Sequence, residues 1–171
     1  MLFRSEIGSN IFVIGKTLGH LNQSELFREV LKMYQGPPPE INLFNEKNNG
    51  LIVQKLISKK LLSSVHDISS GGIIVTLAEM CISGKIGVEI KVPQNKLNLH
   101  EYLFGEDQSR YLLEVGNKNM NEVSKILKEN SIHYEIIGKT QKDSLDIDKK
   151  FKIEISELNR LNSYWFKNYF K

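Results

Sequence analysis

The chain has 171 residues, of which 40% are hydrophobic and 25% are charged, proportions typical of one globular domain with a substantial core. Its formal net charge of +3 comes from 23 basic and 20 acidic residues scattered along the chain, which argues against a nucleic-acid-binding surface. The single cysteine, Cys81, excludes a disulfide framework and suits a small buried position. No apolar run approaches the roughly 18 residues that cross a bilayer. We therefore expect a soluble, cytoplasmic protein that binds neither nucleic acid nor membrane.

The first 60 residues predict one strand and two helices. Residues 11–14 form a compact apolar run that ends at a glycine, which indicates a buried strand. Residues 25–34 predict a helix whose core-facing stripe is Leu26, Phe27, Val30, Leu31 and Tyr34. Prolines 37–39 stop this helix and form a stiff, extended connector. Residues 43–60 predict a second helix, with a kink or later start at residues 48–50, and with a buried stripe of Ile52, Val53, Leu56 and Ile57.

Residues 64–84 read as a strand, a polar turn with two glycines, and a buried helix. The helix is predicted from apolar residues at helical spacing, namely Ile73, Ile74, Leu77 and Cys81. Ser69 and Ser70 are good helix caps, because a hydroxyl can accept a hydrogen bond from an amide of the first turn. Gly71 and Gly72 allow another backbone or an anion to come close. Such a turn is a candidate anion or metal–phosphate site, although a helix cap alone explains the same residues.

The second half continues to alternate strands and helices. We expect strands at residues 88–92, 111–115, 133–137, 145–147 and 151–155, with Gly138 ending the third and a charged turn between the last two. Residues 93–99 are expected to be a loop or a short helical excursion, and residues 120–127 a helix. A last helix at residues 156–170, capped by Ser156, would dock through Trp165, with Leu158, Leu161 and Tyr169 beside it. This alternation predicts an α/β (α+β) fold with a mixed β-sheet packed with helices.

Two acidic clusters could carry chemistry. His66-Asp67 opens the glycine turn, and Glu106-Asp107-Gln108 precedes a buried strand, with Arg110 as a further donor. Carboxylates with neighbouring hydroxyl and amide groups suit Mg²⁺ and phosphate. Two alternatives stay open: Asp107 could be a solvated loop charge, and Glu106 could accept hydrogen bonds from the amides of its own turn. Because the histidines lack metal-ligand spacing and no nucleophile elbow or P-loop lysine motif is present, no catalytic residue is assigned.

Several stretches in series resemble one known family. Residues 65–72 and 103–110 look like its two signatures, and residues 15–24, 37–39 and 137–139 agree in order. They resemble the last domain of the synthetase subunit of the phosphoribosylformylglycinamidine synthase family, which acts in purine biosynthesis. The resemblance runs from about Ile11 to Trp165. It implies the C-terminal-domain fold of the aminoimidazole ribonucleotide synthetase superfamily, as a single domain over residues 1–171 with its core at about 11–165.

The resemblance also implies an activity for the full enzyme. That activity is an ATP- and Mg²⁺-dependent ligase reaction that converts formylglycinamide ribonucleotide to the amidine, with ammonia from a glutaminase partner. The family's catalytic histidine and most of its ATP ligands lie in N-terminal ATP-binding domains that are absent from this sequence. We therefore expect a fragment, an expressed domain or one piece of a split or decayed gene, that is inactive alone. Its expected partners are the missing synthetase domains, the glutaminase, small accessory subunits and a second copy in a homodimer.

The resemblance carries candidate site residues onto both signatures. The candidates for nucleotide or phosphate binding are His66, Asp67, Ser69, Ser70, Gly71, Gly72, Glu106, Asp107 and Gln108. Asp67 is the candidate metal ligand. Ser70 stands where the signature usually has Asp, and Asp107 stands where the commoner form has Ser. Two alternatives remain: a non-catalytic, self-associating remnant or regulatory domain, or another superfamily member of the thiamine-phosphate kinase, selenide synthetase or hydrogenase-maturation type.

Overall fold

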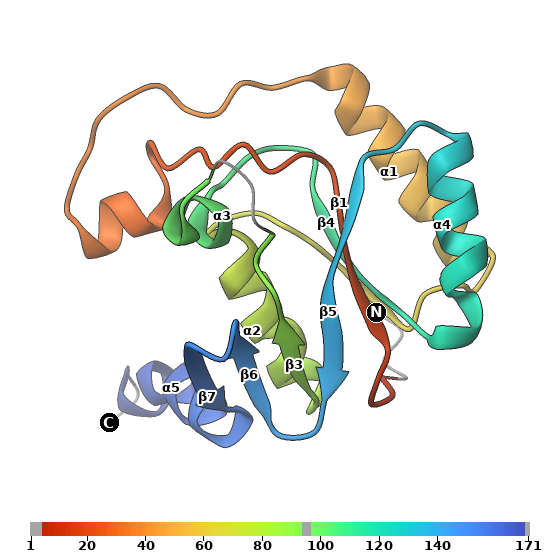
Figure 1. Cartoon of the computed structure of the whole chain (residues 1–171). Coiled ribbons are helices and arrows are strands. Elements are labelled where there is room, and N and C mark those ends of the chain that lie inside the picture. The colour runs from red at the N-terminus through yellow and green to blue at the C-terminus, as the bar shows by residue number, and fades with distance from the viewer. Residues whose placement is uncertain (1–4, 94–96, 170–171) are drawn as a thin grey trace.

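The computed structural model describes residues 5–93 and 97–169, which form a seven-stranded sheet in the order β2-β4-β1-β5-β3-β6-β7 (Figure 1). The strands are β1 (Asn10–Ile14), β2 (Ser64–Asp67), β3 (Gly87–Ile90), β4 (Tyr111–Val115), β5 (Tyr134–Gln141), β6 (Ser144–Ile147) and β7 (Phe151–Glu154). Among the described strands, β3 and β6 pair in parallel and the other neighbours pair antiparallel. This mixed sheet confirms the expected fold class.

Helices cover both faces of the sheet, and β1 shows how the core is divided. The helices are α1 (Leu43–Ser58), α2 (Gly72–Gly84), α3 (Leu99–Phe104), α4 (Met120–Glu129) and α5 (Ile155–Tyr169). Phe12 and Ile14 pack with α1 and α4, whereas the alternate residues Ile11 and Val13 pack with α2, α3 and α5 (Figure 1). Because successive strand residues point to opposite faces, one fully buried strand supports two cores.

The glycine-turn helix α2 carries the lone cysteine, which is 3% exposed, as predicted. Burial raises the pKa of Cys81 to about 12, so the thiol is inert at neutral pH. Helix α1 is also confirmed, but it is continuous, and the expected kink or later start at residues 48–50 is wrong. The Asn49 side chain instead donates to the Ser109 carbonyl at 2.8 Å, which offsets the poor helix propensity of this stretch. None of the described helices is both long and apolar enough to cross a membrane.

The helix predicted at residues 25–34 is confirmed only in its first half. The chain forms only a π-helical turn at Leu26–Val30, and residues 31–42 are irregular. Val30, Leu31 and Tyr34, expected in the core, are 68%, 51% and 68% exposed. An apolar stripe shows that a surface is apolar, but it does not say whether that surface meets the chain's own core.

Three further boundaries differ from the prediction. Strand β5 continues through Gly138, where a Cβ atom would lie 2.0 Å from the Glu89 carbonyl oxygen, so this glycine allows β3 to approach closely. Helix α3 overlaps the expected loop or short helical excursion of residues 93–99 only at Leu99, and a capping box between Asn98 and Glu101 forms its N-terminus. Helix α5 begins at Ile155, so Ser156 is not its cap. The predicted docking role of Trp165 concerns a side chain outside the described part of the structure.

Candidate functional site

The glycine turn connects β2 to α2 and is fastened to the second signature. The Ile68 amide donates to the Arg110 carbonyl at 2.9 Å, which ties the turn to the start of β4. Gly71 and Gly72 both have positive φ, +80° and +67°. A Cβ atom on Gly72 would lie 2.6 Å from the Leu103 carbonyl oxygen. A glycine is therefore needed at position 72, because the backbone has a positive φ there and because α3 approaches closely.

The N-terminus of α2 is capped by a residue from far along the chain. Ser69 and Ser70 are exposed, and neither side chain caps the helix, so the predicted hydroxyl cap is wrong. Glu106 takes that role: its Oε1 atom accepts hydrogen bonds at 2.7 Å from the Gly71 amide and the Glu25 amide. One carboxylate oxygen thus joins the glycine turn to the turn that precedes residue 26. The alternative in which Glu106 serves only its own turn is also wrong.

Asp107 is buried, with 5% of its surface exposed, and it holds a second loop. Its Oδ2 atom accepts hydrogen bonds from the Leu18 and Gly19 amides at 2.9 and 3.0 Å, and its Oδ1 atom accepts one from the His20 amide at 3.2 Å. This excludes the alternative of a solvated loop charge. Its carboxylate lone pairs are directed at backbone amides, so little of the group is left for a ligand.

Arg110 is a buried residue that interacts with Asp107 and with the loop after β1. It is 1% exposed, its Nη1 atom lies 3.8 Å from Asp107 Oδ2, and its Nε atom donates to the Asp107 carbonyl at 3.0 Å. It also donates to the Gly105 carbonyl and the Thr17 hydroxyl. Burial lowers the pKa of the Arg110 guanidinium, and the Asp107 carboxylate opposes that shift. From the sequence, Arg110 was identified only as a hydrogen-bond donor. Its position three residues after Asp107 was the signal that could have predicted an ion pair between them.

The first acidic cluster has a different environment. The Asp67 side chain is 68% exposed, and its Oδ1 atom lies 3.4 Å from His66 Nδ1. The other ring nitrogen of His66 lies 3.4 Å from Glu79 Oε2. Asp67 therefore remains open to solvent, next to the exposed serines of the turn.

The described residues do not form a magnesium site by themselves. Within that part of the chain, no group of three or more histidine, cysteine, aspartate or glutamate side chains could hold a metal ion. Asp107 and one oxygen of Glu106 are engaged by amides, which leaves Asp67 as the exposed carboxylate among the candidate site residues. Mg²⁺ needs several oxygen ligands, so Asp67 could supply only part of a site.

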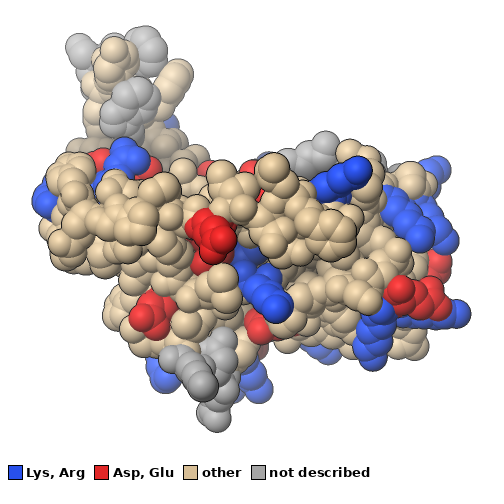
Figure 2. Space-filling view, turned by 90° about the horizontal axis from the view of Figure 1, so that it is seen from above, with Lys and Arg blue, Asp and Glu red and all other residues tan. Residues whose placement is uncertain are grey.

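A hollow of about 620 Å³ lies beside Asp107. Its polar lining includes Lys16, His20, Asn45, Asn49, Asp107, Gln108 and Ser109. The structure thus brings Asp107 and Gln108 together with the loop after β1, whereas His66, Asp67 and the two serines do not line this hollow. Figure 2, viewed from above, shows charged side chains scattered over most of this face, with basic and acidic side chains intermixed toward one end.

Comparisons with known proteins identify the family of this chain. Residues 6–149 match the family described as AIR synthase related protein, C-terminal domain. The chain belongs to this family. It is 49% identical over 164 residues to the phosphoribosylformylglycinamidine synthase subunit PurL of Pelagibacter ubique, covering 96% of this chain and 22% of that protein. It is 36% identical over 159 residues to the subunit of that name from Bartonella henselae, again covering 22% of the relative. These matches confirm the resemblance found in the sequence.

Solved structures with the same fold are more distant in sequence. Thermotoga maritima PurL complexed with FGAR superposes with a TM-score of 0.74 at 15% identity, over 92% of this chain and 29% of that one. The thiamine-monophosphate kinase of Stenotrophomonas maltophilia gives a TM-score of 0.58 at 12% identity, over 85% of this chain and 52% of that one. At such low identity, both likenesses concern the fold alone.

Proposed function

We propose that this chain is the C-terminal domain of a phosphoribosylformylglycinamidine synthase and completes that ATP-dependent ligase without catalysing alone. The observation that carries the proposal is the 49% identity to the Pelagibacter ubique subunit through 96% of the chain. The chain spans 22% of that relative, so most of the relative's sequence lies outside the matched segment. The single domain is proposed to occupy residues 1–171, with its core at about 11–165.

The proposed reaction converts formylglycinamide ribonucleotide to the amidine with ATP and ammonia. Relatives of the same fold from Thermotoga maritima have been solved complexed with FGAR, with ATP and with AMPPCP. Mg²⁺ is proposed to accompany ATP in the full enzyme, with ligands mainly from other domains. It would neutralise phosphate charge when bound.

We assign two kinds of role to the candidate site residues. Asp67, the exposed serines of the turn and Gln108 are proposed to face the nucleotide or its phosphates, with Asp67 as a single metal ligand and His66 orienting it. Glu106 and Asp107 are proposed to act as positioning residues, because their carboxylates already accept hydrogen bonds from backbone amides. Gly71 and Gly72 supply the tight turn that brings α2 under α3.

An exposed apolar surface supports a role within a larger assembly. Eight apolar side chains between residues 18 and 51 are at least half exposed: Leu18, Val30, Leu31, Tyr34, Ile41, Leu43, Phe44 and Leu51. Many exposed apolar side chains on one domain commonly mark an interaction site. We propose that the other synthetase domains cover it in the cytoplasm. A structure named PurLQS from Thermotoga maritima shares the fold, and glutaminase and small accessory subunits are proposed as further partners.

A chimera tests the proposal. The segment of the Pelagibacter ubique subunit that matches this chain would be replaced by this chain, and ATP hydrolysis would be measured with formylglycinamide ribonucleotide and ammonia. We expect activity from the chimera and none from the isolated chain. Turnover by the isolated chain, or a folded chimera without activity, would overturn the proposal.

The same apolar surface also favours a second candidate, a non-catalytic domain that self-associates into a homodimer. Size-exclusion chromatography with light scattering discriminates the two. A dimer of the isolated chain that persists when the other synthetase domains are added would favour this candidate, and a monomer would count against it.

A further inference from the structure

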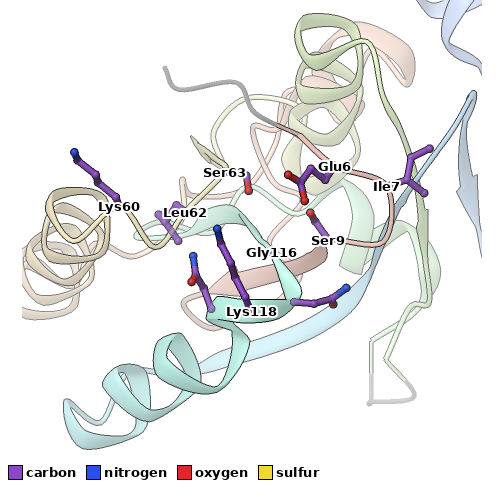
Figure 3. A pocket seen from close by; sticks show the side chains of 10 residues that line it. Glu6, Ile7, Ser9, Lys60, Leu62, Ser63, Gly116 and Lys118 are labelled. Carbon is purple, nitrogen blue, oxygen red and sulfur yellow. The ribbon is translucent and has the colours of Figure 1, made fainter.

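Two features of the structure lie outside the roles proposed above. The first is a hollow of about 530 Å³ before β1, bordered by Glu6 and Lys118 (Figure 3). Figure 3 shows Lys60 directed away from it, and no buried side-chain nitrogen or oxygen of the described residues lacks a hydrogen-bond partner. The hollow therefore holds no buried polar group that a ligand would satisfy. The second feature is the edge of the sheet at β7.

Strand β7 is the last strand in the sheet, and no described strand lies on its outer side (Figure 1). It follows the segment that matches the family model, residues 6–149, so this edge lies outside the matched part of the domain. The edge of a sheet presents backbone amides and carbonyls to any further strand, and proteins usually cover it or guard it with charges. This edge can therefore accept another strand.

Lys152 and Glu154 present the backbone groups of this edge. The Ile155 amide donates to the Asp143 carbonyl at 2.9 Å, and the same register continues along β6 and β7. In an antiparallel pair, only alternate residues direct their amides and carbonyls toward the partner strand. Counting from Ile155, the backbone groups of Lys152 and Glu154 point away from β6, toward the open side.

These two outward residues carry opposite charges. Their side chains lie on one face of the strand and are 59% and 50% exposed, and Lys152 Nζ lies 3.2 Å from Glu154 Oε1. An exposed ion pair of this kind contributes little to the stability of the chain that holds it. Both charges can therefore pair with a second strand instead, at little cost to the fold.

Charge restricts how two copies of this edge can pair. In the antiparallel registers that overlap both outward residues, a two-fold axis passes through Lys152, Ile153 or Glu154. An axis at Lys152 or Glu154 sets two like charges opposite each other, whereas an axis at Ile153 sets each Lys152 opposite a Glu154. Directly opposed unlike charges stabilise a strand pair, and like charges destabilise it. Only the register at Ile153 is therefore free of opposed like charges.

Helix α5 adds an apolar surface next to this edge. In Figure 1 its C-terminal end lies beyond β7, on the side away from β6. Leu161 and Tyr164, in the middle of α5, are 50% and 62% exposed, and Phe151 at the start of β7 is 51% exposed. A strand added at the edge would cover apolar side chains that the chain's own sheet leaves open to solvent.

We propose that β7 pairs antiparallel with the β7 strand of a second copy of this chain, about a two-fold axis at Ile153. Lys152 of each copy then forms an ion pair with Glu154 of the other, and the two sheets become one continuous sheet. The inference goes beyond the proposed function and does not depend on it. Because this dimer uses none of the exposed apolar residues between 18 and 51, it leaves that surface to the other synthetase domains.

Sedimentation velocity of the full chain over a concentration series tests the proposal, and the unmodified chain is expected to dimerise as its concentration rises. Lys152→Glu and Glu154→Lys each oppose like charges, so each alone should weaken the dimer roughly tenfold. An equimolar mixture of the two variants should restore it, because unlike charges then face each other between the chains. Lys125→Glu on α4, which also breaks an exposed ion pair, is the matched control and should dimerise as the unmodified chain does.

Thermal melts establish that each variant is folded. The proposal is overturned if the unmodified chain stays monomeric at every concentration, because the edge is then left to a strand from elsewhere in the polypeptide. It is also overturned if the mixture associates no better than the separate variants. If Phe44→Ser abolishes the dimer and the two charge variants do not, the dimer forms through the surface of residues 18–51 and the proposal is again overturned.

Discussion

The two acidic clusters of this chain look alike in the sequence and behave differently in the structure. Asp67 leaves its side chain 68% exposed beside a histidine, whereas Asp107 is 5% exposed and accepts hydrogen bonds from three backbone amides. The partners of Asp107 lie 87 to 89 residues away, and one partner of Glu106 lies 81 residues away. A carboxylate is available to a ligand only where the fold has not already used its lone pairs.

Because of this difference, we assign the two clusters different roles. Glu106 and Asp107 hold the loop after β1 and the glycine turn in one arrangement, so they build the surface of the site. The turn around Asp67 has free polar groups, so it is the part that can meet a ligand or another domain. The predictions below test this division, from the largest expected effect to the smallest.

Asp107→Ala is expected to have the largest effect. It leaves Arg110 buried without its ion pair and removes the acceptor of three loop amides. Breaking one side of a buried charge pair costs about 3–5 kcal/mol. Urea denaturation of the variant should show a loss of this size, and a loss below about 1 kcal/mol would contradict a positioning role.

Gly72→Ala tests the join between the glycine turn and α3. The added Cβ atom would lie 2.6 Å from the Leu103 carbonyl oxygen in a backbone with φ +67°, so we expect a loss of about 2–3 kcal/mol. Gly116→Ala is the matched control, because nothing lies within 4 Å of its Cβ position and its φ is −60°. Equal unfolding midpoints for the two variants would show that the close approach of α3 is unimportant.

Glu106→Ala should cost about 1–2 kcal/mol, because it removes the acceptor of the Gly71 and Glu25 amides. Glu106→Gln retains an oxygen at that position and should recover part of the loss. Thermal and urea unfolding of the pair provide the measurement. If alanine and glutamine are equally destabilising, the bridging hydrogen bonds are not what the carboxylate contributes.

The smallest effects are expected in the exposed turn. Asp67→Asn and Ser70→Asp should change the free energy of unfolding by less than about 0.5 kcal/mol, because both side chains are exposed. The second change adds a carboxylate at the position where the resemblance leads us to expect Asp. In the chimera with the Pelagibacter ubique subunit, either variant should alter the KM for ATP. A change in stability without a change in KM would contradict the assignment of the Asp67 turn to ligand contact.

Much of the fold was predictable, because strands and helices that pack in the core have apolar residues at regular spacing in the sequence. The apolar run of β1 and the helical spacing in α2 and α4 correctly predicted strands and helices. The resemblance identified the family. The error at residues 25–34 arose because an apolar stripe there faces away from the chain's own core, with Val30 and Tyr34 both 68% exposed.

The candidate site was only partly predictable. The sequence picked out the right segments, but it assigned the cap of α2 to Ser69 and Ser70, which neighbour it, rather than to Glu106, which folding brings to it. The three-residue spacing of Asp107 and Arg110 was compatible with an ion pair, but it did not predict that both are buried, because charged residues in a polar stretch are usually solvated. Long-range hydrogen bonds leave no local pattern, and they decide which carboxylates remain free.

Native-state hydrogen exchange tests the central claim most directly. The amides of Leu18, Gly19 and His20 would be followed by NMR in Asp107→Asn and, as the matched control, in Asp67→Asn. We predict that these three amides exchange about tenfold faster in Asp107→Asn, while the amides of α4 keep their protection and Asp67→Asn matches the unmodified chain. Unchanged protection in Asp107→Asn, or equal acceleration in Asp67→Asn, would contradict the assignment of Asp107 as the residue that positions this loop.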